Sequence, residues 1–242
     1  MNQRIIIIGA TSGIGREVAN LYIAQGWQVG VAGRRATELE SLRQTAPGQV
    51  YTQVIDVTTD DAEQKLQSLI GQMGGMDIFL LSSGIGKQNY TLQSEIELAT
   101  AATNVAGFIH MTNAAYHYFE QQGYGHIAVI SSIAGTKGLG AASAYSATKC
   151  FQNTYIDALD QLARMNKLNI SFTDIRPGFV ATPLLKDDSY PMLMKATDVA
   201  KDIVKAISKK KRVAIIDWKY RILVFFWRLI PRWIWVRLPI RN

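Results

Sequence analysis

A tyrosine and a lysine stand four residues apart, at Tyr145 and Lys149, in a stretch whose apolar spacing predicts a helix over residues 143–165. Side chains at this spacing lie one above the other on the same helix face. A phenol normally ionises near pH ~10, but a neighbouring ammonium favours the phenolate and lowers the pKa. The pair could therefore exchange a proton near neutral pH, although the same spacing is also common in ordinary surface pairs.

A second candidate site lies in the first fifteen residues, which read MNQRIIIIGATSGIG. The run from Ile5 to Ile8 suits a strand buried on both faces of a parallel sheet, and residues 16–22 can continue as a helix. Backbone N–H groups and the helix dipole at such a turn favour a phosphate. We therefore expect a dinucleotide here, although a glycine-rich turn can also be only a tight connection. The residues expected to contact it are Gly9, Thr11, Ser12, Gly13, Ile14 and Gly15.

The expected second strand, residues 28–32, ends at Gly33-Arg34-Arg35. In dinucleotide-binding folds an acidic side chain at this place accepts from the ribose hydroxyls, whereas a basic one accommodates a 2′-phosphate. The acid is missing and two arginines are present, which favours NADP over NAD. The alternative is that Arg34 and Arg35 are ordinary solvated residues. Asp56 and Val57, at the end of the third strand, are expected near the adenine.

Strands and helices alternate along the chain. Further strands are expected at residues 49–54, 77–81, 126–130, 169–175 and 212–217, with helices at 37–45, 61–73, 95–121, 143–165 and 197–208. This order predicts an α/β fold with right-handed crossovers. We expect one domain over residues 1–217, a Rossmann-type doubly wound parallel sheet of about seven strands with helices on both faces, followed by a tail over residues 218–242.

Taken together, these motifs resemble those of the short-chain dehydrogenase/reductase family. They occur in the family's order over about residues 4–217, and Tyr145 follows Ser132 at an offset of thirteen positions. The resemblance implies an NADP-dependent oxidoreductase that transfers a hydride between nicotinamide and a carbonyl or hydroxyl group. The matching pieces are Gly9-x-x-x-Gly13-x-Gly15, Asp56-Val57, Asn104 in Asn-Val-Ala-Gly, Ser132, Tyr145-x-x-x-Lys149, and Pro177-Gly178 followed by Thr182.

The resemblance also implies a role for each catalytic side chain. Tyr145 would be the acid or base, Lys149 would tune it and bind the ribose, and Ser132 would orient the substrate oxygen. Asn104 would hold a water that links Lys149 to solvent. Beyond the glycine turn and the arginines, the expected cofactor contacts are Ser83, Gly84, Tyr145, Lys149, Pro177, Gly178, Val180 and Thr182.

Three features depart from the family pattern. The chain has Leu81-Ser82-Ser83-Gly84 after the fourth strand, where the family usually has Asn-Asn-Ala-Gly. Ile8 stands where a threonine commonly precedes the first glycine. Only fourteen residues separate Thr182 from Thr197, a short version of the segment that commonly covers the substrate, so the substrate side needs another roof.

The cysteine and histidine content excludes two classes of site. The single cysteine, Cys150, leaves no internal disulfide framework and no Cys-rich metal site, and His110, His117 and His126 lack ligand spacing. We therefore expect no metal. The first apolar run leads directly into the glycine turn and does not have the organisation of a signal peptide, so we expect a cytoplasmic protein.

The net charge of +7 comes from the end of the chain: residues 209–242 carry ten Lys or Arg against only Asp217. Four of the five tryptophans lie between residues 218 and 235. No stretch is long enough to span a bilayer, and Pro231 should split the expected helix. An interfacial helix on an anionic membrane has this composition. The alternative is that its apolar face packs on the main domain or on a dimer partner.

We therefore predict an NADP-dependent carbonyl reductase or alcohol dehydrogenase whose substrate is a small apolar or lipid-linked carbonyl compound, with peripheral membrane contact on the cytoplasmic side through residues 218–242. The helices at 95–121 and 143–165 are the family's usual dimer faces, so a homodimer or homotetramer is expected. No nucleic-acid partner is expected. The alternative function is a non-catalytic cofactor-binding regulatory or scaffold protein with the same fold.

Overall fold

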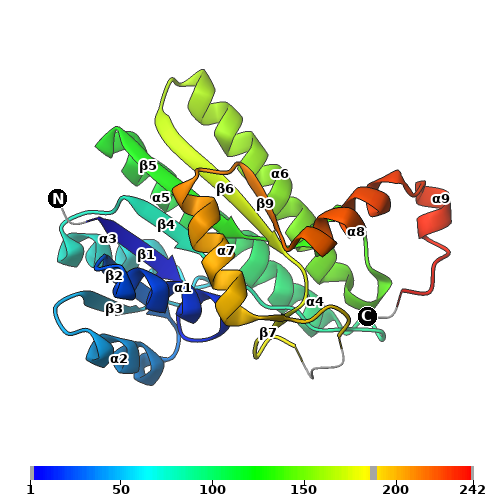
Figure 1. The fold of residues 1–242 in the computed structure, drawn as a ribbon, viewed down its shortest axis with the longest axis horizontal. Helices are drawn as coiled ribbons and strands as arrows, with labels where there is room; N and C mark the ends of the chain where they lie inside the picture. Colours follow the sequence, from blue (N-terminus) through cyan, green and yellow to red (C-terminus); the bar gives the residue numbers. More distant parts are fainter. Residues whose placement is uncertain (1–2, 186–189, 241–242) are drawn as a thin grey trace.

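The structure, a computed structural model, describes residues 3–185 and 190–240. Within these residues, seven parallel strands form one sheet in the order β3-β2-β1-β4-β5-β6-β9 (Figure 1). The predicted doubly wound parallel sheet is therefore confirmed. The strands are β1 (Arg4–Ile8), β2 (Gln28–Gly33), β3 (Val50–Val54), β4 (Ile78–Leu81), β5 (Tyr124–Ile130), β6 (Asn169–Pro177) and β9 (Val213–Ile216).

Helices cover both faces of the sheet, and the isoleucines of β1 show why. Ile6 and Ile8 belong to the core under α3 (Ala62–Met73), α5 (Phe108–Gln122) and α6 (Ser143–Met165). Ile5 and Ile7 belong to the opposite core, under α1 (Gly13–Ala24), α2 (Ala36–Thr45) and α7 (Ala196–Ser208). Successive side chains of a strand point to opposite faces, so an unbroken apolar run requires cover on both.

One predicted helix is divided in the structure. Residues 95–121 were expected to form a single helix, but α4 (Ser94–Ala101) is followed by a π-helical segment (Ala102–Gly107) before α5 begins. Asn104 lies in this segment and bonds the loop after β4 through its side chain. The wider turn therefore coincides with a residue that is held by another element, as π-bulges at functional sites often are.

The last part of the described chain forms two helices, α8 (Trp218–Leu229), which lies beside the end of β9, and α9 (Arg232–Trp235), which lies beyond α8 (Figure 1). Pro231 separates them, as its fixed φ and missing N–H predict. A short parallel pair, β7 (Val180–Ala181) and β8 (Met194–Lys195), joins the two ends of the segment that precedes α7. With two residues each, these strands are too short for a sequence pattern to reveal.

Candidate active site

A cavity of about 810 Å³ lies at the carboxyl ends of the central strands, where open parallel sheets bind their ligands. It extends from the glycine turn after β1 to the helices at the end of the chain. Gly15 and Asn104 do not line it in the part of the chain that the structure describes. The other predicted site residues all do: Gly9, Thr11, Ser12, Gly13, Ile14, Arg34, Arg35, Asp56, Val57, Ser83, Gly84, Ser132, Tyr145, Lys149, Pro177, Gly178, Val180 and Thr182.

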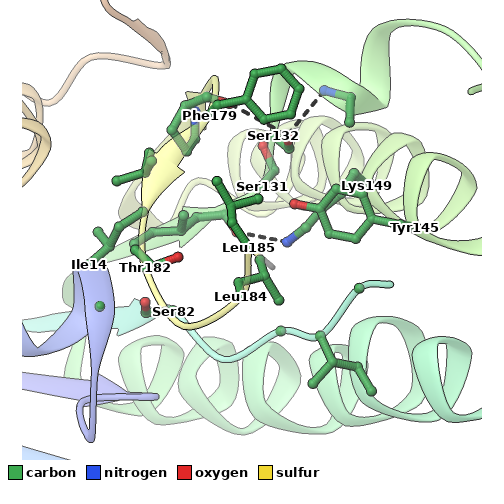
Figure 2. A pocket seen from close by; sticks show the side chains of 18 of the residues that line it. Ile14, Ser82, Ser131, Ser132, Tyr145, Lys149, Phe179, Thr182, Leu184 and Leu185 are labelled. Carbon is green, nitrogen blue, oxygen red and sulfur yellow. Dashed lines mark hydrogen bonds between the residues drawn. The ribbon is translucent and has the colours of Figure 1, made fainter. Parts of the chain in front are cut away.

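Ser132, Tyr145 and Lys149 point into this cavity from two neighbouring elements (Figure 2). Ser132 comes just after β5, and the other two side chains lie in the first two turns of α6. The Nζ atom of Lys149 is 5.7 Å from the centroid of the Tyr145 ring. The Ser132 hydroxyl lies close enough to the Tyr145 phenol to lower the pKa of that phenol. The structure thus brings together the three side chains that the sequence pairs only by spacing.

Two hydrogen bonds fix the position of the Lys149 ammonium. It donates to the carbonyl of Ile130 at 3.1 Å and to Oε1 of Gln152 at 3.0 Å, and the residue is 4% exposed. Burial lowers the pKa of Lys149 to about 8, and the negative charge of Asp174 opposes this fall. Asp174 is itself buried, with its carboxylate paired to Arg176 at 2.6 Å. At neutral pH Lys149 is therefore still mainly an ammonium.

The Tyr145 phenol does not show the lowered pKa that the Tyr–Lys spacing predicts. Burial raises the pKa of Tyr145, and the neighbouring Ser132 hydroxyl opposes this rise. A low-dielectric surrounding disfavours the phenolate as well as the ammonium, so the pair alone does not lower the pKa. The positive nicotinamide of an oxidised cofactor would favour the phenolate, but the chain itself does not supply that charge.

Asn104 lies behind the cavity wall rather than in the cavity. It is fully buried, and its side-chain amide accepts from the backbone N–H of Ile85 at 2.9 Å and donates to the Ile85 carbonyl at 2.7 Å. The same amide donates to the hydroxyl of Thr148 at 3.1 Å. Asn104 therefore fixes the loop after β4 against α6.

Gln152 connects Asn104 with Lys149, and sequence reasoning missed it. Its Nε2 atom donates to the Asn104 carbonyl at 2.9 Å while its Oε1 atom accepts from Lys149. The predicted role of Asn104, holding a water that links Lys149 to solvent, stays a prediction beside this direct link through a buried amide. The sequence contained one signal for the role of Gln152: it is a polar residue one turn after Lys149, on the side of the predicted helix that is buried.

The glycine turn after β1 fits a dinucleotide phosphate. Gly9 has φ of +91°, and a Cβ there would lie 2.6 Å from the amide nitrogen of Ser83. A Cβ at Gly15 would overlap the carbonyl of Gly9, so this glycine lets α1 begin directly against the turn. The first turn of α1 contains no acidic residue. Its N–H groups and dipole therefore present positive potential to the cavity, as an anion requires.

The two arginines after β2 are arranged differently. Arg35 reaches over the glycine turn, and its Nη2 atom donates to the hydroxyls of Thr11 at 2.8 Å and Ser12 at 2.7 Å. Arg34 lies close enough to Asp56 to help lower the pKa of that carboxyl, although a hydrogen bond from the Thr58 backbone is the larger cause. Both arginines line the cavity beside the turn, and both are exposed.

The end of the chain supplies the missing roof on the substrate side. Tyr220, Leu223, Trp227 and Ile240 line the cavity opposite the glycine turn. Tyr220 and Val224 are 1% and 2% exposed and form a small apolar core with Ile133. The tail (residues 218–240) therefore packs on the main domain through one side, which the sequence left open as one of two alternatives.

A family model described as short chain dehydrogenase matches residues 3–191. The chain belongs to the short-chain dehydrogenase family. This assignment agrees with the fold and with the placement of Ser132, Tyr145 and Lys149 in one cavity. It makes the chain an oxidoreductase of the short-chain dehydrogenase type.

Relatives of this short-chain dehydrogenase cover nearly its whole length. An uncharacterized oxidoreductase of Myxococcus xanthus is 29% identical over 93% of this chain and 92% of its own. Dehydrogenase/reductase SDR family member 7B of Bos taurus is 28% identical over 95% of this chain and 78% of its own. The crystal structure of 3-ketoacyl-(acyl-carrier-protein) reductase from Brucella melitensis complexed with NADH has a TM-score of 0.79, with 22% identity over 89% of this chain and 96% of that one. At that identity the match shows the shared fold alone.

Proposed function

We propose that this protein is an NADP-dependent carbonyl reductase or alcohol dehydrogenase that acts on an apolar small-molecule or lipid-linked substrate. The observation that carries the proposal is the convergence of Ser132, Tyr145 and Lys149 with a phosphate-binding glycine turn in a single cavity. A scaffold protein that only bound the cofactor would have no need for this acid–base set.

The residues of the chain supply the proton and stabilise the charge. A bound NADPH contributes the hydride. As negative charge builds on the substrate oxygen, the Ser132 hydroxyl donates a hydrogen bond to it and the Tyr145 phenol delivers a proton. The Lys149 ammonium stabilises the phenolate that remains. Its bonds to Ile130 and Gln152 keep the ammonium on the side of the ring where it can do so.

The choice of NADP rests on the absence of an acid after β2 and on the two guanidinium groups there. Arg35 is fixed over the turn by the hydroxyls of Thr11 and Ser12, so it faces the region next to the phosphate site. A guanidinium binds phosphate through charge-assisted hydrogen bonds. Arg34 lines the same part of the cavity and completes a site of positive potential for a 2′-phosphate.

The choice of an apolar substrate rests on the wall opposite the cofactor turn. Nine of the described lining residues there carry no formal charge; they come from the loop before α6, the segment before α7, and the tail. Such a wall favours an apolar substrate, because the transfer of apolar surface from water into the cavity is favourable. The residues are Leu139, Ala141, Leu184, Leu185, Tyr190, Met192, Leu223, Trp227 and Ile240.

The side of the tail that faces away from the domain supports binding to a membrane surface. This outer face consists of Trp218, Ile222, Phe225, Phe226, Leu229, Trp233 and Val236, each of which is at least 49% exposed. Exposed basic residues flank it, namely Lys219, Arg221, Arg228, Arg232 and Arg237. Aromatic and apolar side chains bordered by cations fit the interface of an anionic bilayer. In the described residues no helix is long and apolar enough to cross a membrane.

Self-association is a further part of the proposal. Leu98 on α4 and Leu162 on α6 are 69% and 41% exposed, on the helices expected to form the dimer faces. We expect a homodimer or homotetramer at the cytoplasmic face of the membrane.

The test is an assay of NADPH oxidation with a panel of apolar aldehydes and ketones. Tyr145→Phe removes the transferable proton but keeps the ring, so turnover should fall at least ~10²-fold while NADPH still binds. Tyr155→Phe is a matched control, because it removes a hydroxyl that donates to Asn113 at 2.8 Å, outside the cavity. Full activity in Tyr145→Phe would refute the assignment. A parent protein that binds NADPH and reduces no carbonyl would favour the scaffold alternative.

A further inference from the structure

Tyr220 lies where the tail meets the turn after β6. It sits in the first turn of α8, after Asp217, whose carboxylate accepts from the Lys219 N–H at 2.7 Å and caps the helix. The Tyr220 ring covers Gly178, and a Cβ at Gly178 would overlap it. The glycine is therefore required by this contact, not by its own backbone conformation.

The Tyr220 hydroxyl joins two segments that belong to different parts of the site. It accepts from the backbone N–H of Phe179 at 3.1 Å. It also donates toward the carbonyls of Pro191 at 3.1 Å and Met192 at 3.2 Å. One buried hydroxyl thus fixes the turn after β6 to the segment that leads into β8.

Both segments shape the cavity. Gly178 and Phe179 line it on the cofactor side, and Pro191 and Met192 line it on the substrate side. The same segments are also joined by the β7–β8 pairing and by the Met194 N–H, which donates to the Phe179 carbonyl at 3.0 Å. The Tyr220 hydroxyl therefore adds a further connection between two segments that both line the cavity.

A second anchor holds the tail on the loop between Ser132 and Tyr145. The indole N–H of Trp235 donates to the Gly138 carbonyl at 2.7 Å, and the Lys137 ammonium donates to the Ile230 carbonyl at 2.8 Å. The same ammonium lies 5.7 Å from the centroid of the Trp235 ring. The tail consequently spans the two loops that flank the catalytic side chains.

We propose that Tyr220 is a positioning residue for the reaction: it holds the Gly178–Phe179 turn and the Pro191–Met192 segment in the arrangement that binds the nicotinamide half of the cofactor. The inference rests on the proposed function for what is bound, but its structural part concerns the protein alone. It assigns the tail a role inside the active site, in addition to covering it.

The experiment compares Tyr220→Phe with the parent protein. The variant keeps the ring over Gly178 and loses only the hydroxyl. Tyr118→Phe is the matched control. The Tyr118 hydroxyl also accepts a hydrogen bond from a backbone N–H, that of Met76, and it donates to Gln122. These contacts lie at the amino end of β4, whereas the cavity lies at the carboxyl ends of the strands. The two variants should lose similar stability, because each gives up comparable hydrogen bonds.

Two readouts separate positioning from stability. In Tyr220→Phe the amide of Phe179 should exchange with deuterium faster than in the parent, and NADPH, measured by fluorescence titration, should bind about five- to tenfold more weakly. Tyr118→Phe should change neither. The proposal is overturned if Tyr220→Phe matches the control in both readouts. Because neither readout requires turnover, a parent that reduces no carbonyl would refute the proposed function without affecting this test.

Discussion

Lys149 makes folding stability depend on pH in a specific direction. Its pKa is about 8 in the folded protein, below its usual value of 10.5. The Lys149 side chain therefore binds a proton more readily in the unfolded chain than in the folded protein. This difference reduces the free energy of unfolding by its full amount below pH 8, and the reduction disappears as the pH rises through 10.5. A lowering of this size corresponds to ~3 kcal/mol.

We expect Lys149→Met to be more favourable for stability at pH 7 than at pH 10, by up to ~3 kcal/mol, because methionine carries no charge to bury. Urea unfolding of both proteins at both pH values measures this difference, and the titration of all other groups cancels. An equal effect of the substitution at the two pH values would mean that Lys149 does not titrate in this range.

Arg34 and Arg35 should decide the cofactor. Charge-assisted hydrogen bonds of this kind are worth ~1.5–3 kcal/mol each. NADPH should therefore bind more tightly than NADH, and an Arg34→Asp, Arg35→Ala double variant should lose the preference. Fluorescence titrations with both cofactors test this. Arg43→Ala, which breaks only an exposed pair with Glu40, is the control. Equal affinities in the parent protein would contradict the prediction.

Residue spacing and the family resemblance predicted that Ser132, Tyr145 and the two arginines belong to one site, and all four line the cavity. Gln152 could not be predicted from residue spacing. Its two partners come from α6 and from the π-helical segment before α5, and nothing in the sequence around Gln152 names the second. A residue whose role depends on packing between distant segments carries no local pattern.

The loop after β4 approaches α6 closely at Tyr145. A Cβ at Gly86 would overlap the Tyr145 ring, so Gly86→Ala should displace the ring and lower kcat by ~10-fold or more. Steady-state kinetics measure this. Gly71→Ala in α3 is the control, because nothing lies within 4 Å of its added methyl. It should leave kcat unchanged and raise stability by ~0.5–1 kcal/mol. Unchanged kcat in Gly86→Ala would show that the loop moves freely away.

The order of helices and strands followed from hydrophobic periodicity, since the apolar pattern of an element is set by the faces it must bury. The break between α4 and α5 did not follow, because it coincides with the Asn104 contacts to Ile85 rather than with any change in periodicity. The β7–β8 pair was missed because two residues are too few for a period. Elements that depend on contacts between segments are the ones that the pattern omits.

The tail presents a different surface on each side, and this changes how membrane binding must be tested. Tyr220 and Trp235 are buried against the domain, so deleting the tail would expose core surface and obscure any effect on lipid binding. The composition of the tail predicted either packing or membrane contact. The amphipathic pattern could not show that the apolar residues are divided between two faces.

A variant of the outer face is therefore the appropriate probe. Trp218→Ser, Phe225→Ser and Phe226→Ser together remove side chains that are 58% to 59% exposed, so stability should change little. The parent should sediment with phosphatidylglycerol vesicles at low salt and less at high salt, and the triple variant should remain in the supernatant. Arg228→Gln with Arg232→Gln should weaken binding to these vesicles but not to neutral phosphatidylcholine. A parent protein that ignores anionic vesicles at low salt would remove the membrane part of the proposal.

The position of Ile240 in the cavity lining has a practical consequence for anyone who handles this protein. A segment that continued the chain directly after Ile240 would begin at the lining of the cavity and would compete with what binds there. Arg4, by contrast, begins β1 at the amino end of the strand and does not line the cavity. Purification and immobilisation for ligand measurements should therefore use the N-terminal end.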